Sequence, residues 1–444
     1  LALIGGQLGL HSAMAGARVA APLQALSLGW GAPAVGALLA LFAAAPVLLA
    51  LHAGRMADRH GYHRPLHVAV AMTTLGGALA LLASWLSGAF HAALLGLGAL
   101  LMGGGSNIGL ITVQRTASRS ARDQAERVRV FSWLGLAPAL SNMIGASAAG
   151  VLIDAAGFRG AFAALMLMPL AALACARAVP REAVPPEAVP PAGAAASADR
   201  SQAAANGATQ APRHAVANAA AASPAAASPA AANAAADAAA PSLLASAWQL
   251  LKLPGIAPLL ALNWVLSACW DVHGFAVPIL GHERGFSAST IGFVLGVFPL
   301  AVSAVRLATP LLASRLQPLR VLLATMLASA CVFGVYPLTR TPMAMAACAV
   351  ALGLALGAVQ PMIMSTLHAL TPPERHGEAI ALRSMAINAS SLAMPLLFGA
   401  LGAALGVAML FWAMALALLA NAWLTRRIDA SLLKDEPTGT AGAR

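Results

Sequence analysis

The feature that most constrains this chain is a succession of apolar runs, each of about 20 residues, the length of α-helix that crosses the roughly 30 Å hydrocarbon core of a bilayer. Hydrophobic residues make up 60% of the 444 residues and charged residues only 9%. Soluble domains carry roughly a quarter charged residues, so we expect an all-α integral membrane protein. The twelve expected spans are residues 1–25, 33–53, 66–86, 92–113, 130–153, 161–178, 255–280, 288–311, 318–338, 343–366, 379–402 and 407–425.

Residues 180–246 interrupt this series with a segment rich in Ala, Pro, Ser and Asn that contains almost no large hydrophobic residues. Such a composition cannot bury enough apolar surface to fold by itself, so we expect a disordered linker. Six spans precede it and six follow it. The expected organisation is a six-helix bundle over residues 1–179, a cytoplasmic linker over 180–246, a second six-helix bundle over 247–428 and a cytoplasmic tail over 429–444.

The two halves of the chain repeat one another. An offset of 256 residues places Gly29 on Gly285 and Gly36 on Gly292, and an offset of 250 residues aligns the later spans. Turn residues that recur in order at one offset indicate a duplicated unit, so we expect two pseudo-symmetric six-helix bundles. The other matched pairs include Gln7 with Asn263, Pro22 with Pro278, Trp30 with Phe286, Phe42 with Phe298, Gly103 with Gly353 and Ser141 with Ser391.

A dense group of charges separates the second and third spans, in the segment Gly54-Arg55-Met56-Ala57-Asp58-Arg59-His60-Gly61-Tyr62-His63-Arg64-Pro65. We expect this segment to form a turn, with Gly54 and Gly61 supplying the tight backbone geometry. Asp58 can accept hydrogen bonds from helix N-terminal amides, and Arg59 and Arg64 can pair with it or with lipid phosphate.

The pattern Gly-x-x-x-Asp-Arg-x-Gly-x-x-Arg in this segment resembles the loop signature between helices two and three of the major facilitator superfamily of secondary transporters. The resemblance implies twelve helices in two six-helix halves, a central substrate cavity lined by helices 1, 4, 7 and 10, and a cytoplasmic gate that this loop helps to latch. On this resemblance, the gate residues are Gly54, Asp58, Arg59, Gly61 and Arg64, joined by Arg315 and Arg320 in the second half.

The distribution of positive charge predicts which side of the membrane each loop occupies. With the Asp58 segment placed in the cytoplasm, most of the 26 Lys and Arg lie in or beside cytoplasmic segments, Arg383 among them. Because cytoplasmic loops are enriched in these residues, both termini are expected in the cytoplasm. The net charge of +11 then reflects topology rather than a nucleic-acid partner. The abundance of Ala and Arg suggests a bacterial protein, and hence the inner membrane.

Polar side chains within the spans are the candidates for a substrate pathway, since a polar group in lipid is costly and usually faces a cavity or another helix. On the first span, Gln7, His11 and Arg18 fall within about 40° of one another on a helical wheel. The alternatives are that Arg18 snorkels to the interface and that the amides hold helices together. The complete set of pathway candidates is Gln7, His11, Arg18, Asn107, Gln114, Asn142, Asn263, Trp270, Gln360 and Asn388.

Asp271 is the carboxylate that we place deepest within a span. A carboxyl group in apolar surroundings can gain and lose a proton as its environment changes, which makes Asp271, with the nearby His273, the candidate for proton coupling. The alternatives are an ion pair between Asp271 and Arg18 or a histidine, and ordinary packing of the His273 ring. The basic face of the first span favours an anionic or zwitterionic substrate.

The sequence lacks the motifs of enzymes and ATP-driven pumps. It has no phosphate-binding glycine loop with lysine, no paired carboxylates within spans and no nucleophile at a recognisable spacing from a histidine. The four cysteines lack the spacing of disulfide or zinc sites. We therefore expect no enzyme, cofactor or metal site, but a monomeric secondary transporter that moves a small molecule, with protons, across the lipid bilayer. The alternatives are proton-driven efflux of cationic amphiphiles, with Asp271 as the cation's partner, and a non-transporting sensor with the same fold.

Overall fold

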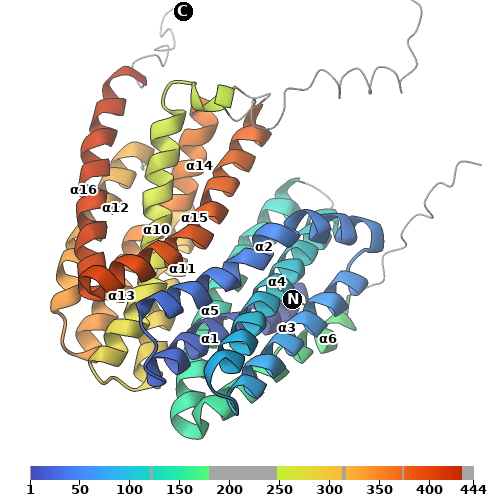
Figure 1. Cartoon of the computed structure of the whole chain (residues 1–444). Helices are drawn as coiled ribbons and strands as arrows, with labels where there is room; N and C mark the ends of the chain where they lie inside the picture. Colours follow the sequence, from blue (N-terminus) through green and yellow to red (C-terminus); the bar gives the residue numbers. More distant parts are fainter. Residues whose placement is uncertain (1, 121–123, 180–247, 313–316, 373–374, 433–444) are drawn as a thin grey trace, which may run out of the picture. The chain divides into compact units, whose positions relative to one another are not determined.

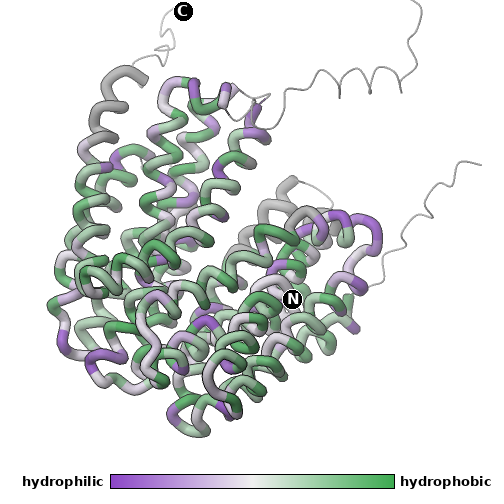
Figure 2. Tube along the Cα trace, viewed as in Figure 1, coloured by the Kyte–Doolittle hydropathy of each residue, from purple (hydrophilic) through white to green (hydrophobic). Residues whose placement is uncertain are grey.

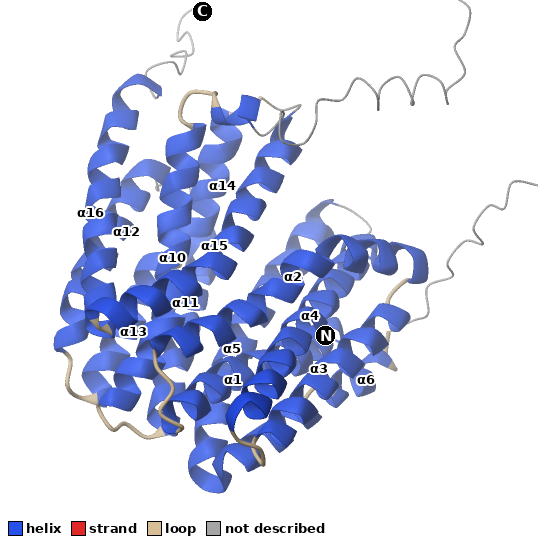
Figure 3. Ribbon diagram, in the orientation of Figure 1, coloured by secondary structure: helices blue, strands red, loops and turns tan. Residues whose placement is uncertain are grey.

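The computed structural model describes residues 2–120, 124–179, 248–312, 317–372 and 375–432, which form helices with no β-strand among them. Figures 1 and 3 show the helices packed side by side in two groups. The expected linker at 180–246, Arg315 and most of the expected tail lie outside the described residues. The helices are α1 (Ala2–Ser27), α2 (Ala32–His60), α3 (His63–Ala83), α4 (Gly88–Ser120), α5 (Gln124–Leu167), α6 (Leu170–Ala176), α10 (Ile256–Glu283), α11 (Ala288–Leu312), α12 (Pro318–Val335), the 3-10 helix η2 (Tyr336–Leu338), α13 (Pro342–Leu356), α14 (Val359–Leu370), α15 (His376–Leu405) and α16 (Val407–Leu432).

Nine helical stretches of the described chain are long and apolar enough to cross a membrane. One of them contains two crossings, because α5 is interrupted at Gly157, where φ is 68°, and its second part continues through α6. The tenth crossing is also in two pieces, since α13 and α14 are separated at Gly357 and Ala358. With α1 and α16 the described chain makes twelve crossings, six from α1–α6 and six from α10–α16, as the sequence predicts.

The charged segment after the second span is not a turn over its whole length, which corrects the prediction. Helix α2 continues through Gly54 and Asp58 to His60, and the turn consists of Gly61 and Tyr62. Gly61 has a φ of 67°, a left-handed conformation that favours glycine. Gly54 is an ordinary helical residue, so the helix ends only where the backbone leaves helical φ.

The internal repeat predicted from the sequence is visible in the backbone. Gly29 and Gly285 adopt positive φ values of 79° and 71°, just after α1 and α10. The amide that follows each glycine, in Trp30 and in Phe286, donates to the carbonyl five residues earlier at 2.9 Å. Identical turns at an offset of 256 residues confirm that the two six-helix bundles are pseudo-symmetric.

The two bundles pack against each other mainly through two pairs of helices, α2 with α15 and α5 with α11, with smaller contacts of α1 and α2 with α10. A glycine lies at each of the two main crossings. A Cβ added to Gly36 would overlap the carbonyl oxygen of Pro395, and a Cβ added to Gly292 would overlap that of Ala146. Because Gly36 and Gly292 are related by the same offset, the repeat extends to the interface between the bundles. Small residues allow membrane helices to approach closely in this way.

The outside of the protein is apolar. Figure 2 shows hydrophobic residues along the lengths of the helices and hydrophilic residues concentrated near helix ends. Large side chains such as Leu75, Phe90 and Leu416 are exposed on this surface. An extensive exposed apolar surface is suited to lipid rather than to water. The chain is therefore a multi-pass membrane protein.

Successive crossings run in opposite directions, which gives the protein two faces. The end of α2 at Asp58 and the start of α15 at His376 lie at one of them, named the Asp58 face below. The start of α11 at Ala288 and the break in α5 after Asp154 lie at the other, named the Asp154 face.

Candidate functional site

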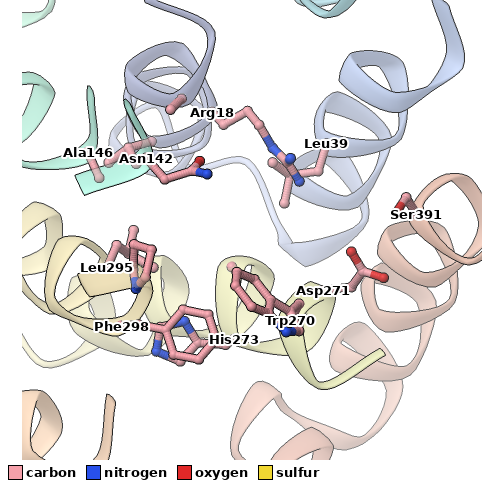
Figure 4. Close-up of a pocket in the computed structure, with 14 residues that line it drawn as sticks. Arg18, Leu39, Asn142, Ala146, Trp270, Asp271, His273, Leu295, Phe298 and Ser391 are labelled. Atoms are coloured by element: carbon pink, nitrogen blue, oxygen red, sulfur yellow. The ribbon is translucent and has the colours of Figure 1, made fainter. Parts of the chain in front are cut away.

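A cavity of about 280 Å³ lies between the two bundles and is lined by side chains from both of them. Figure 4 shows these side chains on α1, α2, α5, α10, α11 and α15. Residues that are distant in the sequence, and that were predicted one span at a time, thus meet at one place. The predicted site residues that line this cavity are Arg18, Asn142, Trp270, Asp271 and His273.

Arg18 and Asp271 reach into this cavity from opposite halves of the chain (Figure 4). Their charges interact electrostatically, and Asp271 also accepts a hydrogen bond of 3.4 Å from the Ser390 hydroxyl. At the repeat offset of 256 residues, Arg18 corresponds to Gly274 and Asp271 to Ala15, both of which line the same cavity. The two halves therefore differ at both charged positions, because the residue equivalent to each charged side chain is a small one.

An aromatic wall closes one side of the cavity. The His273 ring stacks on Phe298 with centroids 4.4 Å apart, and Trp270 meets Phe298 edge-on at 4.6 Å. The buried hydroxyl of Tyr336 lies 3.2 Å from Nε2 of His273 and holds the imidazole in place. Sequence reasoning missed Tyr336, because it lies on a short helix outside the pattern of polar residues within spans. The wall offers ring faces to an apolar or cationic part of a ligand.

A second cavity of about 170 Å³ shares Arg18 with the first. The predicted residues His11, Asn107 and Asn388 line it. Nδ1 of His11 lies 3.0 Å from the hydroxyl oxygen of Ser106, which orients the imidazole. Arg18 therefore lies between two polar spaces and can contact a ligand in either of them.

Four predicted pathway residues lie away from both cavities. Gln7 is fully buried and its side-chain amide has no hydrogen-bond partner among the described residues, whereas Gln114 is exposed. Gln7 shares a helix face with Arg18 but lies eleven residues away, about 16 Å along the axis, so a common face does not mean a common depth. Asn263 and Gln360 accept hydrogen bonds from Arg383 instead.

The burial of Arg383 was not predicted from the sequence. Sequence reasoning counted this arginine among the charges beside the cytoplasmic loops, yet its relative exposure is only 7%. Helix α15 begins at His376, so Arg383 lies about two turns inside it rather than at its end. A charge inside a span was the signal that could have identified it.

At the Asp58 face, the partner of Asp58 differs from the expected ones. Nε of Arg115, on α4, donates to a carboxylate oxygen of Asp58 at 2.9 Å, while Arg59, Arg64 and Arg320 are exposed. Side chains at neighbouring positions on a helix point about 100° apart, so Arg59 points away from Asp58. Helix α4 packs against α2, and this packing brings Arg115 to Asp58. This ion pair lies entirely within the first bundle.

At the Asp154 face, a carboxylate of the first bundle binds the start of a helix of the second. The oxygens of Asp154 accept hydrogen bonds from the backbone amides of Ala288 and Ser289, at 3.1 and 2.8 Å. These amides belong to the first turn of α11, where a helix has free N–H groups and a partial positive charge. The contact joins the two bundles directly.

The sequence profile of the Major Facilitator Superfamily matches residues 3–270 and, a second time, residues 259–442. The chain belongs to the major facilitator superfamily. Members of this superfamily are membrane transporters, so this major facilitator protein is a transporter rather than an enzyme. Among curated proteins, none matches it in sequence.

Solved structures of low sequence identity share the fold of this major facilitator protein. A POT family transporter in complex with 5-aminolevulinic acid superposes with a TM-score of 0.70, at 11% identity and over 96% of both chains. The nucleoside transporter NupG has a TM-score of 0.65, at 11% identity, over 96% of this chain and 99% of its own. A peptide transporter POT has a TM-score of 0.64, at 15% identity, over 96% of this chain and 94% of its own. At these identities the likeness establishes the fold alone.

Proposed function

We propose that this transporter is proton-coupled and moves a small organic anion or zwitterion by alternating access. The observation that carries the proposal is that Arg18, on one bundle, and Asp271, on the other, line one cavity. A substrate bound between them contacts both bundles, so its binding free energy depends on how the bundles are arranged. A ligand shifts a conformational equilibrium only through such unequal affinity for the two states.

The two charges favour a substrate that carries a carboxylate or a similar group. A guanidinium binds a carboxylate through two parallel hydrogen bonds, which makes Arg18 the group that holds the substrate's negative end. Asp271 then receives either the substrate's ammonium group or a proton. The cavity of about 280 Å³ suits a small molecule rather than a polymer.

Proton coupling follows from the competition between these partners for Arg18. While Asp271 is ionised, it attracts Arg18 across the cavity. A proton on Asp271 removes that attraction and leaves Arg18 available to an anionic substrate. Uptake of the proton and of the anion therefore favour each other, with His273 and the Ser390 hydroxyl as neighbouring groups that assist the exchange.

The contacts at the two faces support alternating access. Asp154 bonds across the bundles at its own face, whereas Asp58 pairs with Arg115 inside the first bundle. This asymmetry fits a state held closed at the Asp154 face and free to open at the Asp58 face. We place the Asp58 face and both termini in the cytoplasm of a bacterium and the helices in its inner membrane, with residues 180–246 linking the two bundles. A single chain contains the whole cavity, which fits a monomer.

A second candidate is the efflux of cationic amphiphiles. The aromatic wall of Trp270, His273 and Phe298 beside Asp271 has the chemistry of a cation site. Arg18 opposes this candidate, because its charge would repel a cation in the same cavity.

Uptake by the full chain in liposomes separates these two candidate functions. The panel contains 5-aminolevulinic acid, because a structural neighbour is in complex with it, together with a dipeptide, a dicarboxylate and the cation tetraphenylphosphonium. Accumulation of a carboxylate-bearing compound that lasts only as long as an imposed pH gradient supports the proposal. Movement of tetraphenylphosphonium alone favours cation efflux, and carboxylate uptake that does not respond to the pH gradient contradicts proton coupling.

A further inference from the structure

Arg383 forms a polar cluster that the proposed transport site does not use. Its guanidinium, on α15, donates from Nε to the side-chain oxygen Oδ1 of Asn263 on α10 at 3.2 Å, and from Nη2 to the side-chain oxygen of Gln360 on α14. Three helices of the second bundle thus meet at one buried cation. Both of its partners are neutral amides.

No carboxylate within the described chain pairs with Arg383. On the same three helices, Glu378 bonds to Arg375 at 2.8 Å and Glu283 is exposed at the far end of α10. Asp271 is eight residues from Asn263, about 12 Å along α10. A buried positive charge without a counter-charge is costly, which points to an anion that is not part of the chain.

Asn263 supplies a second and independent sign of a missing acceptor. Its relative exposure is 1%, and its side-chain NH2 group has no hydrogen-bond partner among the described residues. Buried donors nearly always have an acceptor, so the NH2 of Asn263 is a donor without an acceptor next to a buried positive charge. Such a donor-only arrangement fits an oxyanion.

The cluster lies in line with the central cavity along the same two helices. Asn263 and Arg383 link α10 to α15 at one level, and Asp271 and Ser390 link them again at another. Ser391, which lines the central cavity, is eight residues from Arg383, about 12 Å along α15. The Arg383 level is nearer to the start of both helices, and hence nearer to the Asp58 face.

We propose that Arg383 and Asn263 form a second oxyanion-binding position, which receives the carboxylate, phosphate or sulfate group of the substrate between the central cavity and the Asp58 face. This inference rests on the proposed function, and it restricts the substrate to compounds with an oxyanion. The anion makes charged hydrogen bonds with Arg383 and fills the free donors of Asn263. Arg18 and Arg383 then act as two successive positions for one anionic group.

Equilibrium binding of inorganic sulfate to the purified full chain tests this position. Isothermal titration is expected to give two sulfates per chain, and Arg383→Gln to remove one of them or weaken its affinity by at least tenfold. Arg18→Gln should affect only the other sulfate. Arg340→Gln, which changes an exposed arginine, is the matched control and should bind as the unmodified protein does. Unchanged sulfate binding in Arg383→Gln overturns the proposal.

A second variant tests the same position in case Arg383→Gln fails to fold. Asn263→Asp places a carboxylate beside Arg383, so it should raise the Tm without sulfate and remove the same sulfate site. If Arg383 only holds the three helices together, Arg383→Gln lowers the Tm and leaves both sulfates bound, which contradicts the proposal.

Displacement of the Arg383 sulfate by phosphatidylglycerol micelles but by no soluble phosphate ester would identify a lipid site and also contradict the proposal. None of these measurements uses a proton gradient, so this inference and the proposed coupling can fail separately.

Discussion

Asp154 and Ser289 join the two halves of the protein, with a carboxylate oxygen of Asp154 2.8 Å from the backbone nitrogen of Ser289. The second oxygen accepts from Ala288, so one side chain caps the start of α11 across the interface between the bundles. The pseudo-equivalent junction lacks this contact. At the offset of 250 residues Asp154 corresponds to Ala404, and the N-terminus of α2 has no side-chain cap. Of the two equivalent helix crossings, only the one between α5 and α11 thus has a carboxylate bonded to the start of the facing helix.

Replacement of Asp154 by Asn should shift the protein toward a state open at the Asp154 face. The charge at a helix N-terminus contributes about 1 kcal/mol, which corresponds to about a fivefold change in the equilibrium between states. Spin labels on Leu28→Cys and Leu338→Cys, both exposed at this face on opposite bundles, report the change as a longer inter-label distance. The background for labelling has its four native cysteines replaced. Glu283→Gln, which neutralises an exposed acid at the same face, serves as the control and should leave the distances unchanged.

Replacement of Asp271 by Asn should uncouple transport from protons. The amide keeps the size of the side chain and an acceptor for Ser390 but cannot gain or lose a proton. We expect pH-driven accumulation in liposomes to disappear, while exchange of labelled for unlabelled substrate at equal pH continues. Retention of pH-driven accumulation by this variant would remove Asp271 from the coupling mechanism.

Substitution of Arg18 should impair substrate binding in proportion to the hydrogen bonds lost. Charged hydrogen bonds contribute about 1.5–3 kcal/mol, so Arg18→Gln is expected to lower kcat/KM for uptake by about 10- to 100-fold. Arg18→Lys keeps the charge without the planar pair of donors and should give an intermediate loss. Arg340→Gln is the comparison at an exposed site. Equal uptake by all three variants would mean that Arg18 does not hold the substrate.

Enlarging the glycines at the helix crossings should destabilise the contact between the bundles. In Gly36→Ala and in Gly292→Ala the added methyl group would overlap a backbone carbonyl of the facing helix, and overpacking of this kind costs about 1–3 kcal/mol. Both variants should unfold at a lower temperature in scanning fluorimetry. Gly334→Ala, where a Cβ meets no atom within 4 Å, is the matched control and should keep the original Tm. If all three variants unfold together, the crossings do not limit stability.

The parts of the fold that could be read from the sequence are those that local properties determine. The twelve crossings follow from the length and composition of single apolar runs, and the repeat follows from glycines such as Gly29 and Gly285 that a left-handed turn requires. The positions at which helices end were harder to predict from the sequence. Gly54 and Gly61 are the same residue type in the same charged segment, yet only Gly61 leaves the helix.

The candidate site was predictable as a set of residues but not as an arrangement. A charge inside a span is conspicuous, and this identified Arg18 and Asp271 separately. Helical periodicity places Gln7 on the same face as Arg18 but says nothing of depth, and Gln7 lies away from both cavities. Periodicity also cannot pair Arg383 with Asn263, because the two residues belong to helices that are far apart in the chain.

The sequence by itself determined that this chain crosses a bilayer in two related bundles, because backbone hydrogen bonding within lipid and hydrophobic length act on each helix separately. Only the tertiary structure decided that Arg18 faces Asp271, that Asp154 caps α11 and that Arg383 is buried beside two amides. These relationships arise where α1 packs against α10, α5 against α11 and α10 against α15, and the packing of helices from distant parts of the chain is not encoded in any one of them.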